Sequence, residues 1–336
     1  MKKVNLAIVG ATGLVGRTFL KVLEERNFPI NNLRLFASAN SAGKEIIFKG
    51  EKFVIEALNE DSFYGLDIAL FSAGSSVSKE YAPNAAKSGC VVIDNSSAWR
   101  RDENVPLVVP EVNPEDIFKH NGIIANPNCN VIPLAVVFGP LHKKYQITRV
   151  VVSTYQSISG AGQKGIDKLE KEIQGKQTND KHRIFSNIIF HPIEPEQPEI
   201  TNEEAKLHFE PCKILHSLDI KITSTCVRLP FFACHCEAVN IETKLPFELD
   251  EVKYLLSNSK GIIIIDDLIN EDYPTPDIVK GKDEVFVGRI RRDNTIENGL
   301  NLWVVSDNIR KGAATNAIQI AEILINSEKK EVMSLG

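Results

Sequence analysis

Near its start the chain reads Leu6-Ala7-Ile8-Val9-Gly10-Ala11-Thr12-Gly13-Leu14-Val15-Gly16, an apolar run that leads into a glycine-rich loop. The run at 6–9 predicts a buried strand, and the apolar residues of 13–26 recur at the spacing of a helix. Small residues at such a junction let backbone amides approach a pyrophosphate at the helix N-terminus, where the dipole favours anions. The stretch therefore predicts a nucleotide-binding loop. Its spacing departs from G-x-G-x-x-G, so a tight turn without a ligand stays an alternative.

The composition is that of an ordinary globular protein, with 43% apolar and 25% charged residues. A length of 336 residues suffices for two domains, and the net charge of −5 gives no reason to expect nucleic-acid or membrane-surface binding. We expect neither a signal peptide nor a transmembrane span, because the first apolar run is short and ends at glycine. The six cysteines are too scattered for a disulfide scaffold, which favours the reducing cytoplasm.

The first third of the chain alternates strand-like and helical segments. Such βα repeats predict a Rossmann-type parallel sheet with helices on its faces. A further helix is expected at 77–87. The remaining strands are expected at 33–37, 67–71, 91–93, 107–109 and 122–125.

After residue 127 the strand-like runs become longer and lie close together. They predict a mixed or antiparallel sheet in a second, α+β domain, with a hairpin loop at 293–299. The polar stretch 171–204 is either a surface loop or a helical lobe, and the amphipathic helix at 313–325 is expected to return to the first domain. The expected domains are therefore 1–128 with 307–336, and 129–306. The strands of the second are expected at 149–155, 219–229, 234–243, 285–292 and 300–305.

The end of the second strand bears on cofactor choice. An NAD site usually places an acidic residue there, whereas Ser38, Asn40 and Ser41 are followed by no carboxylate before Glu45. Hydroxyl and amide donors together with Lys44 favour a 2′-phosphate. NADP is therefore the predicted cofactor, with relaxed use of NAD and NADP as the alternative.

Cys129 is the predicted nucleophile. It follows Asn126-Pro127-Asn128 at the end of a strand-like run and precedes an apolar, helical stretch at 131–138. Backbone amides at a helix N-terminus favour the thiolate, which is the reactive form. The alternative is a buried structural cysteine, which is the interpretation we favour for the other five.

The string Cys234-His235-Cys236 could suggest a metal site, but neighbours in a strand point to opposite faces and no second ligand pair stands at zinc spacing. We therefore predict no metal. His235 is the best acid/base candidate. The other histidines lie in polar or loop-like contexts, typical of surface residues, at 120, 142, 182, 191, 208 and 216.

Three groups of charged residues are candidates for anion or substrate binding. Arg228 borders an apolar segment and needs an anion, either a structural carboxylate or a substrate carboxylate that matches its planar fork. Glu210 and Lys213 would share a helix face, and Pro211 between them would suit a first helical turn. A surface ion pair is the simpler interpretation of that pair. Arg100-Arg101 could meet phosphate or could be a solvated pair.

Ordered motifs across nearly the whole chain resemble bacterial aspartate-semialdehyde dehydrogenase. They are Gly10-Ala11-Thr12-Gly13-Leu14-Val15-Gly16, Asp94-Asn95-Ser96-Ser97, Val108-Val109-Pro110-Glu111-Val112-Asn113, Asn126-Pro127-Asn128-Cys129, Ser153-Thr154-Tyr155-Gln156, Ser159-Gly160-Ala161-Gly162, Cys226-Val227-Arg228-Leu229-Pro230 and Ser306-Asp307-Asn308-Ile309-Arg310-Lys311-Gly312-Ala313-Ala314.

The resemblance implies an activity and a role for each matched residue. The implied reaction is the NADP-dependent reduction of 4-phospho-L-aspartate to L-aspartate 4-semialdehyde through a Cys129 thioester, in the biosynthesis of lysine, diaminopimelate, methionine, threonine and isoleucine. It also implies a homodimer or homotetramer, with catalysis and dimerisation in the second domain. The implied catalytic residues are Cys129, His235 and Gln156. The implied substrate-binding residues are Arg100, Asn128, Glu210, Lys213 and Arg228. The implied cofactor contacts are Gly10, Thr12, Gly13, Leu14, Val15, Ser38, Asn40, Ser41, Ser159, Gly160 and Asn308.

Three other functions compete with this one. N-acetyl-glutamyl-phosphate reductase performs the same chemistry on a longer substrate, but its cysteine usually sits in a Pro-Gly-Cys context, unlike Asn128-Cys129. A non-catalytic cofactor-binding paralogue should lack the cysteine or the histidine. A nucleotide-sugar epimerase would need a Tyr-x-x-x-Lys pair, and neither Tyr81 nor Tyr145 has a lysine four residues later.

Overall fold

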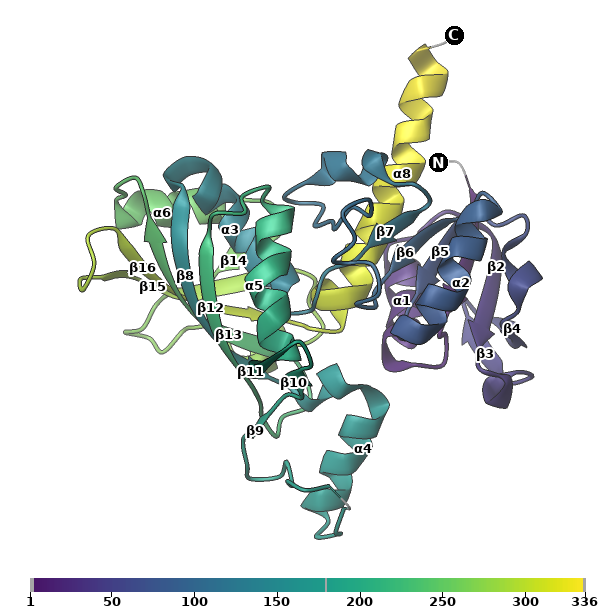
Figure 1. Ribbon diagram of the computed structural model, residues 1–336, viewed down its shortest axis with the longest axis horizontal. Helices are drawn as coiled ribbons and strands as arrows, with labels where there is room; N and C mark the ends of the chain where they lie inside the picture. The colour runs from purple at the N-terminus through teal and green to yellow at the C-terminus, as the bar shows by residue number, and fades with distance from the viewer. Residues whose placement is uncertain (1–2, 179, 335–336) are drawn as a thin grey trace. The chain divides into compact units, whose positions relative to one another are not determined.

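The computed structural model describes residues 3–178 and 180–334. The chain forms two compact units, Met1–Pro127 with Ala313–Gly336, and Asn128–Gly312. Each unit is built on its own seven-stranded sheet (Figure 1). Across the described ranges, no helix combines the length and the hydrophobicity that a bilayer crossing requires.

The first unit has the predicted Rossmann-type sheet, in the order β3-β4-β2-β1-β5-β6-β7. Strand β1 pairs in parallel with both β2 and β5, and β6 and β7 continue the parallel ladder. The strands are β1 (Val4–Val9), β2 (Ile30–Ala37), β3 (Glu45–Phe48), β4 (Glu51–Ala57), β5 (Ile68–Phe71), β6 (Val91–Asp94) and β7 (Ile123–Ala125). The helices are α1 (Leu14–Glu25), α2 (Ser75–Lys87) and α8 (Asn316–Ser334), with 3-10 helices η1 (Ala39–Ser41), η2 (Glu60–Phe63) and η3 (Pro114–Lys119).

Two details of the first sheet differ from the sequence prediction. The segment 107–109 is not a strand, because it makes a single bridge, from Leu107 to Ala125, and then turns. The antiparallel pair β3–β4 was not predicted, since its outer face leaves Ile47 and Val54 exposed and so lacks a clear buried pattern.

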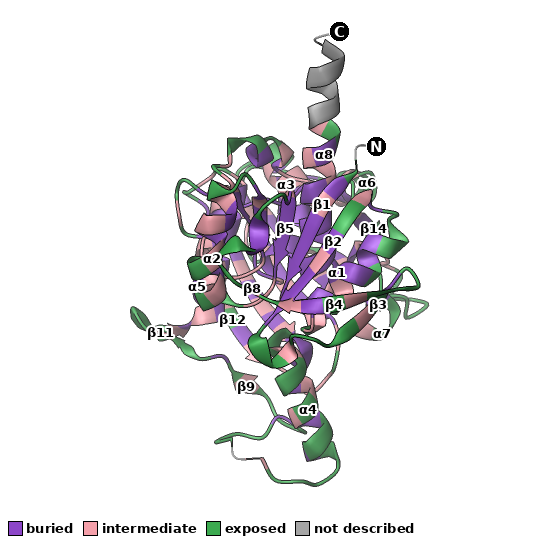
Figure 2. Cartoon of the chain, turned by 90° about the vertical axis from the view of Figure 1, so that its right-hand side faces the viewer, coloured by how far each residue is buried: buried purple, intermediate pink, exposed green. Residues whose placement is uncertain are grey.

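Helix α8 completes the core of the first unit. Its buried residues Ala317, Ile318 and Ala321 pack in one cluster with side chains of β1 and α1. At its start, the Asn316 side chain donates to the carbonyl of Val108. Figure 2 shows β1 and β5 of this unit as almost wholly buried strands.

The second unit holds a mixed sheet in the order β14-β15-β16-β13-β8-β12-β9. The hairpin β15–β16 is antiparallel as predicted, but β12 and β8 are parallel neighbours. Helix α5 packs on β12 (Figure 1). The strands are β8 (Ile147–Gln156), β9 (Ile189–Phe190), β12 (Lys221–Arg228), β13 (His235–Thr243), β14 (Ile262–Ile264), β15 (Val285–Asp293) and β16 (Gly299–Ser306). The helices are α3 (Val131–Tyr145), α4 (Gly162–Ile173), α5 (Asn202–Ile214), α6 (Leu249–Ser257) and α7 (Pro276–Val279), with the 3-10 helix η4 (Ile158–Ala161).

The segment between α4 and α5, which we call the arm (residues 174–201), is a surface excursion and not a helical lobe. It contributes β9 to the sheet edge and forms a small hairpin from β10 (Ile193–Glu194) and β11 (Gln197–Thr201). The buried carboxylate of Glu172 holds the first half of the arm in place, because it accepts hydrogen bonds from the backbone N–H groups of Ile184 and Phe185. Most of the arm is exposed (Figure 2), apart from a few residues that face the sheet.

Candidate active site

Three neighbouring strands of the second unit place Gln156, Arg228 and His235 in one row. Gln156 pairs with Arg228 across the parallel β8–β12 ladder, and with His235 across the antiparallel β8–β13 ladder. Residues that pair directly in a ladder point to the same face of the sheet. An amide, a guanidinium and an imidazole, each predicted from the sequence to belong to the site, therefore lie side by side at the ends of three strands.

His235 is buried and electrically neutral. Burial, and then the nearby positive charge of Arg228, lower the pKa of His235 to about 3. Its Nδ1 lies 3.1 Å from the backbone N–H of Ser157 and 3.1 Å from the carbonyl of Cys234. Nδ1 accepts from the Ser157 N–H when it is unprotonated and donates to the Cys234 carbonyl when it is protonated. It therefore has a backbone partner in either tautomer. Nε2 is buried with no hydrogen-bond partner. Nε2 is thus the nitrogen that is free to exchange a proton with a reacting group.

Arg228 is fixed by its neighbours. Its Nη1 donates to the carbonyl of Ser157 at 2.7 Å, and its Nη2 lies 3.2 Å from Nδ1 of His191. Burial lowers the pKa of Arg228, while the negative charges of Glu203 and Cys129 raise it. The guanidinium is therefore held within electrostatic reach of the Cys129 sulfur, where it favours the thiolate.

Cys129 is half-buried and lies immediately before the N-cap of α3, which is Asn130. At this helix start the amides of Asn130 and Ile132 donate to the side-chain and backbone oxygens of Asn128, so Asn128 holds the cysteine segment at the positive end of α3. The backbone of Gly312 packs against the cysteine: a Cβ built there would lie 3.2 Å from Cβ of Cys129. The other cysteines are buried, and burial raises the pKa of Cys226 and Cys236 to about 12 each. Cys129 is the thiol whose surroundings suit nucleophilic chemistry.

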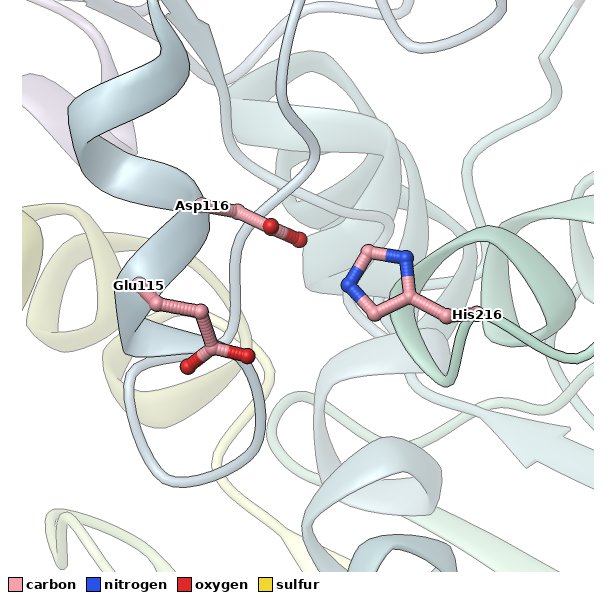
Figure 3. A group of neighbouring side chains, drawn as sticks. All are labelled: Glu115, Asp116 and His216. Carbon is pink, nitrogen blue, oxygen red and sulfur yellow. The ribbon is translucent and has the colours of Figure 1, made fainter.

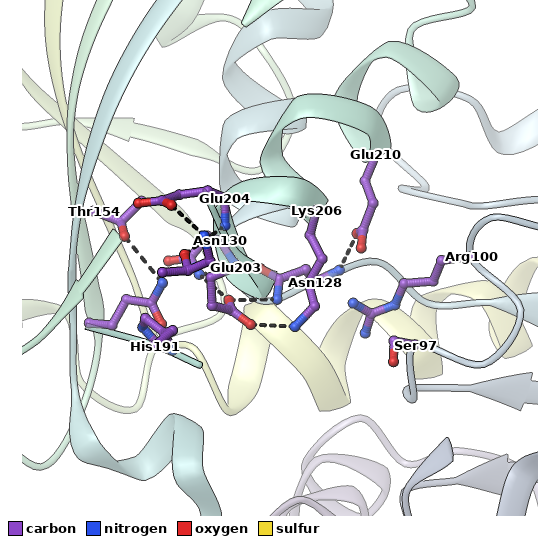
Figure 4. A network of polar contacts seen from close by, with 12 residues as sticks. Ser97, Arg100, Asn128, Asn130, Thr154, His191, Glu203, Glu204, Lys206 and Glu210 are labelled. Atoms are coloured by element: carbon purple, nitrogen blue, oxygen red, sulfur yellow. Dashed lines mark hydrogen bonds and ion pairs between the residues drawn. The ribbon is translucent and has the colours of Figure 1, made fainter. Parts of the chain in front are cut away.

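A buried polar network includes Asn128 and Asn130, the residues on both sides of Cys129 (Figure 4). The carboxylate of Glu203 accepts hydrogen bonds from the side chains of Asn128 (3.0 Å) and Asn130 (3.3 Å), and it pairs with Lys206. Burial alone would raise the pKa of Glu203, but Lys206, His191 and the hydrogen bonds lower it to about 2. The residues on both sides of Cys129 are thus tied to one ionised carboxylate.

Glu210 and Lys213 share α5, but the helix begins well before them. Thr201 forms a capping box with Glu204, so Pro211 lies near the C-terminal end of the helix and not in its first turn as predicted. A proline there costs one internal hydrogen bond in a helix already held by its cap. The buried carboxylate of Glu210 accepts a 2.7 Å hydrogen bond from the backbone N–H of Asn128, and Lys213 is half-buried.

The sequence reasoning missed the pair Glu203 and Lys206. They have the same Glu-x-x-Lys spacing as Glu210 and Lys213 and lie seven residues earlier in the chain. The signal that could have found them is Thr201-Asn202-Glu203-Glu204, whose Thr-x-x-Glu pattern marks a helix start and so places Glu203 in the first turn.

His191 was predicted to be a surface residue, and this is wrong. Strand β9 pairs with the end of β12, with Ile189 opposite Arg228, and this pairing carries His191 inward. The His191 side chain is buried, and burial together with Arg228 lowers its pKa to about 4. Its polar, loop-like sequence context gave no sign of this, because the pairing joins segments far apart in the chain.

Ser159, Gly160 and Asn308, which the resemblance implies as cofactor contacts, lie beside the same row. The Asn308 amide bonds the hydroxyl of Ser159, which in turn lies 2.9 Å from the hydroxyl of Ser157. A Cβ on Gly160 would lie 3.0 Å from Nη1 of Arg228 and 3.3 Å from Nε2 of His235. A side chain at this position would therefore crowd both Arg228 and His235.

The glycine loop of the first unit fits a pyrophosphate. Gly10 has φ +88°, and a Cβ there would lie 2.4 Å from the carbonyl of Ser72. A Cβ on Gly16 would lie 2.2 Å from the carbonyl of Gly10, so only glycine permits this close packing. Gly13 is the N-cap of α1, with no side-chain capping bond and no acidic residue in the first turn. The amides of Leu14 and Val15 and the neighbouring Thr12 are thus placed at a free, electropositive helix end.

The region after β2 carries no acidic group that is free to hold a ribose. Ser38 and Asn40 are exposed and Ser41 is half-buried in and beside η1. Glu45 pairs with Lys52 at 2.9 Å, and Lys44 is exposed.

Arg100 is buried within the first unit and is not a solvated surface residue. Its Nε donates to the carbonyl of Asn126 and its Nη2 to the carbonyl of Asn95. These bonds fix the guanidinium beside the Asn95-Ser96-Ser97 turn.

Figure 3 draws three side chains of the kind that ligate metals, Glu115 and Asp116 from η3 of the first unit and His216 from the second unit. The carboxylate of Asp116 is already engaged within its own unit, by Lys119 at 2.6 Å and by Asn113 at 2.7 Å. Asp116 has a structural role in closing η3.

Glu237 has no evident structural partner. It lies two residues after His235 on the same face of β13, opposite Thr154 of β8, and neither carboxyl oxygen has a hydrogen-bond partner. Burial raises the pKa of Glu237 well above 4.5. The side chain is thus a neutral acid next to the row of Gln156, Arg228 and His235.

Replacing this acid is expected to stabilise the protein at high pH. Between the unfolded and the raised folded pKa, the unfolded chain releases a proton that the folded chain keeps, so stability falls by up to about 1.4 kcal/mol per pH unit as pH rises. Glu237→Gln abolishes this loss. Thermal unfolding should give nearly equal midpoints for variant and wild type at pH 4.5 and a higher midpoint for the variant at pH 8. A lower midpoint for the variant at pH 8 would mean that Glu237 is ionised and paired.

The fold and site define the class of two-domain semialdehyde dehydrogenases. The family model described as "Semialdehyde dehydrogenase, NAD binding domain" matches residues 5–120, and "Semialdehyde dehydrogenase, dimerisation domain" matches residues 138–311. The chain is 54% identical over 332 residues to the aspartate-semialdehyde dehydrogenase of Aquifex aeolicus, covering 96% of this chain and 98% of the relative. The chain belongs to the aspartate-semialdehyde dehydrogenase family of oxidoreductases, as the resemblance of its motifs predicted.

Solved structures of aspartate-semialdehyde dehydrogenases have a similar fold. Aspartate semialdehyde dehydrogenase II of Vibrio cholerae, complexed with ASA, has a TM-score of 0.92 at 44% identity, covering 97% of this chain and 99% of that one. The aspartate semialdehyde dehydrogenase of Candida albicans, solved with NADP, has a TM-score of 0.78 at 25% identity, covering 96% and 98%.

Proposed function

We propose that this enzyme reduces 4-phospho-L-aspartate to L-aspartate 4-semialdehyde with NADPH, in the biosynthesis of the aspartate-derived amino acids. The observation that carries the proposal is the row of Gln156, Arg228 and His235 with Cys129 in electrostatic reach of Arg228. This set supplies a nucleophile, a proton carrier and a carboxylate site for an amino-acid substrate. The V. cholerae relative, complexed with ASA, supports the substrate class.

We assign the substrate's charged groups to oppositely charged side chains. Arg228 binds the α-carboxylate through its planar fork. Glu203 binds the ammonium group, because it is ionised and because its negative charge, like that of Cys129, raises the pKa of Arg228. We propose Glu203 in place of Glu210 because Glu203 and not Glu210 is among the charges that act on Arg228. The carboxylate of Glu210 accepts a hydrogen bond from the backbone N–H of Asn128 and so positions the cysteine segment.

The leaving phosphate needs cations and amide donors. Lys206 and Asn128 meet at Glu203, next to the cysteine, and are the first candidates in the second unit. Arg100 in the first unit and Lys213 on α5 remain proposed phosphate ligands, as the family resemblance implies.

In the reductive direction the Cys129 sulfur attacks the acyl carbon, and Gln156 orients the acyl group. The carbon–oxygen bond to phosphate breaks, phosphate leaves with the bonding electrons, and a thioester remains on Cys129. When bound, the reduced nicotinamide supplies the two electrons that bring this carbon to the aldehyde level. The oxyanion formed at this carbon collapses to the aldehyde carbonyl as the carbon–sulfur bond breaks, which regenerates the Cys129 thiolate. Nε2 of His235 takes the thiol proton when Cys129 enters the reaction as a thiol.

NADP is the proposed cofactor. The free N-terminus of α1 would hold the pyrophosphate, and Ser38, Asn40 and Ser41 would meet the 2′-phosphate without a competing carboxylate. The C. albicans relative, solved with NADP, supports this choice, and relaxed use of NAD stays the alternative.

We assign nucleotide binding to the first unit, and catalysis and dimerisation to the second, and expect a homodimer or homotetramer. The six cysteines, all within the described residues, form no disulfide, which suits the reducing cytoplasm as the place of action.

Steady-state oxidation of L-aspartate 4-semialdehyde, run with phosphate and with NADP and NAD in parallel, tests the proposal. We expect a rate that depends on phosphate and is higher with NADP. N-acetyl-glutamate 5-semialdehyde should be a poor substrate. A faster rate with the acetylated semialdehyde, or a rate indifferent to phosphate, would contradict the proposed function.

A further inference from the structure

Ser157, the residue after Gln156, contacts two side chains of the row through its backbone. Its N–H lies 3.1 Å from Nδ1 of His235, and its carbonyl accepts a 2.7 Å hydrogen bond from Nη1 of Arg228. The hydroxyl of Ser157 faces the histidine as well, with Oγ at 3.4 Å from Nδ1. Ser157 is fully buried, so bulk water does not compete with this hydroxyl. One residue thus presents both a backbone and a side-chain group to the same nitrogen of His235.

The hydroxyl of Ser157 has one proton and three acceptors within reach. They are Oγ of Ser159 at 2.9 Å, Oδ1 of Asn308 at 3.2 Å and Nδ1 of His235 at 3.4 Å. Asn308 closes a small ring of hydrogen bonds, because its Nδ2 donates to the Ser159 hydroxyl at 3.0 Å. The two closer acceptors belong to Ser159 and Asn308, so the hydroxyl proton of Ser157 points to them. A lone pair of the Ser157 oxygen is then left to face Nδ1 of His235.

The hydrogen-bond partners of His235 favour its ring proton on Nδ1. A proton on Nδ1 has two acceptors, the Cys234 carbonyl at 3.1 Å and the Ser157 hydroxyl at 3.4 Å. A proton on Nε2 would have no acceptor among the described residues, because Nε2 is buried without a partner. A buried donor left unpaired costs free energy. The backbone N–H of Ser157 favours the opposite tautomer, so the hydroxyl shifts the balance between the two toward Nδ1–H.

Charged groups surround the ring of His235 but, within the described part of the chain, none of them forms a hydrogen bond to it. Burial and the charge of Arg228 lower the pKa of His235 to about 3, so the ring is neutral and carries one proton. The hydrogen bonds at Nδ1 are therefore what distinguishes the two ring nitrogens. The other titratable groups near the ring are Glu203 of α5, His191 of the arm and the neutral acid Glu237, two residues along β13.

We propose that Ser157 is a positioning residue that acts through His235: its hydroxyl holds the ring proton on Nδ1 and so leaves Nε2 unprotonated, ready to take the thiol proton of Cys129. In that step the S–H bond breaks, its electron pair stays on sulfur, and an N–H bond forms at Nε2. The imidazolium so formed keeps the Cys234 carbonyl and the Ser157 hydroxyl as acceptors at Nδ1. The inference deepens the proposed function and rests on it.

The rate at which iodoacetamide alkylates Cys129 tests this role, because the thiolate is the form that reacts. The rate is measured at pH 6.5 and at pH 9.5, on either side of the ordinary pKa of a thiol. Mass spectrometry locates the modified cysteine. Ser157→Ala removes the hydroxyl and keeps both backbone groups, whereas Ser157→Thr keeps the hydroxyl. Ser306→Ala is the matched control: Ser306 pairs with His235 across the β13–β16 ladder, and its buried hydroxyl has no hydrogen-bond partner among the described residues.

We expect Ser157→Ala to be alkylated about 10-fold more slowly than wild type at pH 6.5, the factor that follows from the loss of one hydrogen bond to a charged group. At pH 9.5 the two rates should agree within about 2-fold, because a thiol then ionises without a base. Ser157→Thr and Ser306→Ala should stay within about 3-fold of wild type at both pH values. The kcat/KM for aspartate semialdehyde should show the same dependence on pH.

A wild-type rate of alkylation in Ser157→Ala at pH 6.5 would overturn the inference. An equal loss at both pH values would also overturn it, because the hydroxyl would then support only the packing of the site. A loss in Ser157→Thr as large as that in Ser157→Ala would do the same, since threonine keeps the hydroxyl.

The tautomer of His235 can also be measured in the wild-type enzyme, which decides the question should Ser157→Ala fail to fold. In protein labelled with ¹⁵N-histidine, the His235 signals are those that disappear in His235→Asn. At neutral pH their nitrogen shifts should show a protonated Nδ1 and an unprotonated Nε2. The reverse pattern would overturn the inference.

The outcome separates from that of the proposed function. A wild-type enzyme that does not oxidise aspartate semialdehyde refutes the proposed function. A wild-type enzyme that does so, with a Ser157→Ala variant of unchanged alkylation rate at pH 6.5, refutes only the role of Ser157.

Discussion

Cys129→Ala is expected to lower the turnover of aspartate semialdehyde by about 10⁴-fold or more, because no other group can form the thioester. The half-buried sulfur lies before the N-terminus of α3 and within reach of the charge of Arg228. The other thiols lack both features. The measurement is kcat by NADPH formation at saturating phosphate.

NADP binding, followed by nucleotide fluorescence, should persist in this variant, because the glycine loop belongs to the other unit. The matched control is Cys90→Ala, which removes a buried thiol whose pKa burial raises to about 12. This control should keep most of the wild-type rate. Substantial phosphate-dependent turnover by Cys129→Ala would exclude the cysteine as nucleophile.

Arg228→Lys is expected to lower kcat/KM by about 100-fold, in the range measured when one partner of a buried charged pair is removed. Lysine keeps the positive charge but lacks the planar guanidinium. The guanidinium of Arg228 bonds Ser157 and His191 and, in the proposed complex, also the substrate carboxylate. The loss should fall mainly on aspartate semialdehyde and much less on 3-aminopropanal, which lacks the carboxylate.

The control for Arg228 is Arg291→Lys, an exposed arginine on β15 of the same unit. It should leave both substrates unaffected. Unchanged kinetics of Arg228→Lys with aspartate semialdehyde would remove this residue from the substrate site.

Local sequence pattern predicted most of the fold. Strand β1, the glycine turn and α1 follow one another directly in the chain, and so do the two strands of the hairpin β15–β16, so the local pattern of residues was enough to predict them. The parallel pairing of β8 with β12 was not predicted, because it joins segments separated by α4, the arm and α5. Pairing between distant strands is set by tertiary packing and leaves no local pattern.

The residues of the candidate site also fall into those that a local motif predicts and those that depend on distant pairing. Cys129, Gln156, Arg228 and His235 could be predicted because each lies in a recognisable motif, and the structure brings Gln156, Arg228 and His235 into one row. The position of α5 was misjudged, because Pro211 was taken to mark a helix start whereas the Thr201 capping box does so. His191 could not be found, since its burial depends on β9 joining the sheet beside β12.

The most direct test of the central claim is a single-turnover reaction in the oxidative direction, with NADP and aspartate semialdehyde but no phosphate. The claim of a Cys129 thioester predicts a burst of about one NADPH per active site. Mass spectrometry of the quenched enzyme should then locate one aspartyl group on the peptide that contains Cys129, and added phosphate should release it. A burst without an adduct, or an adduct on another residue, would contradict the account.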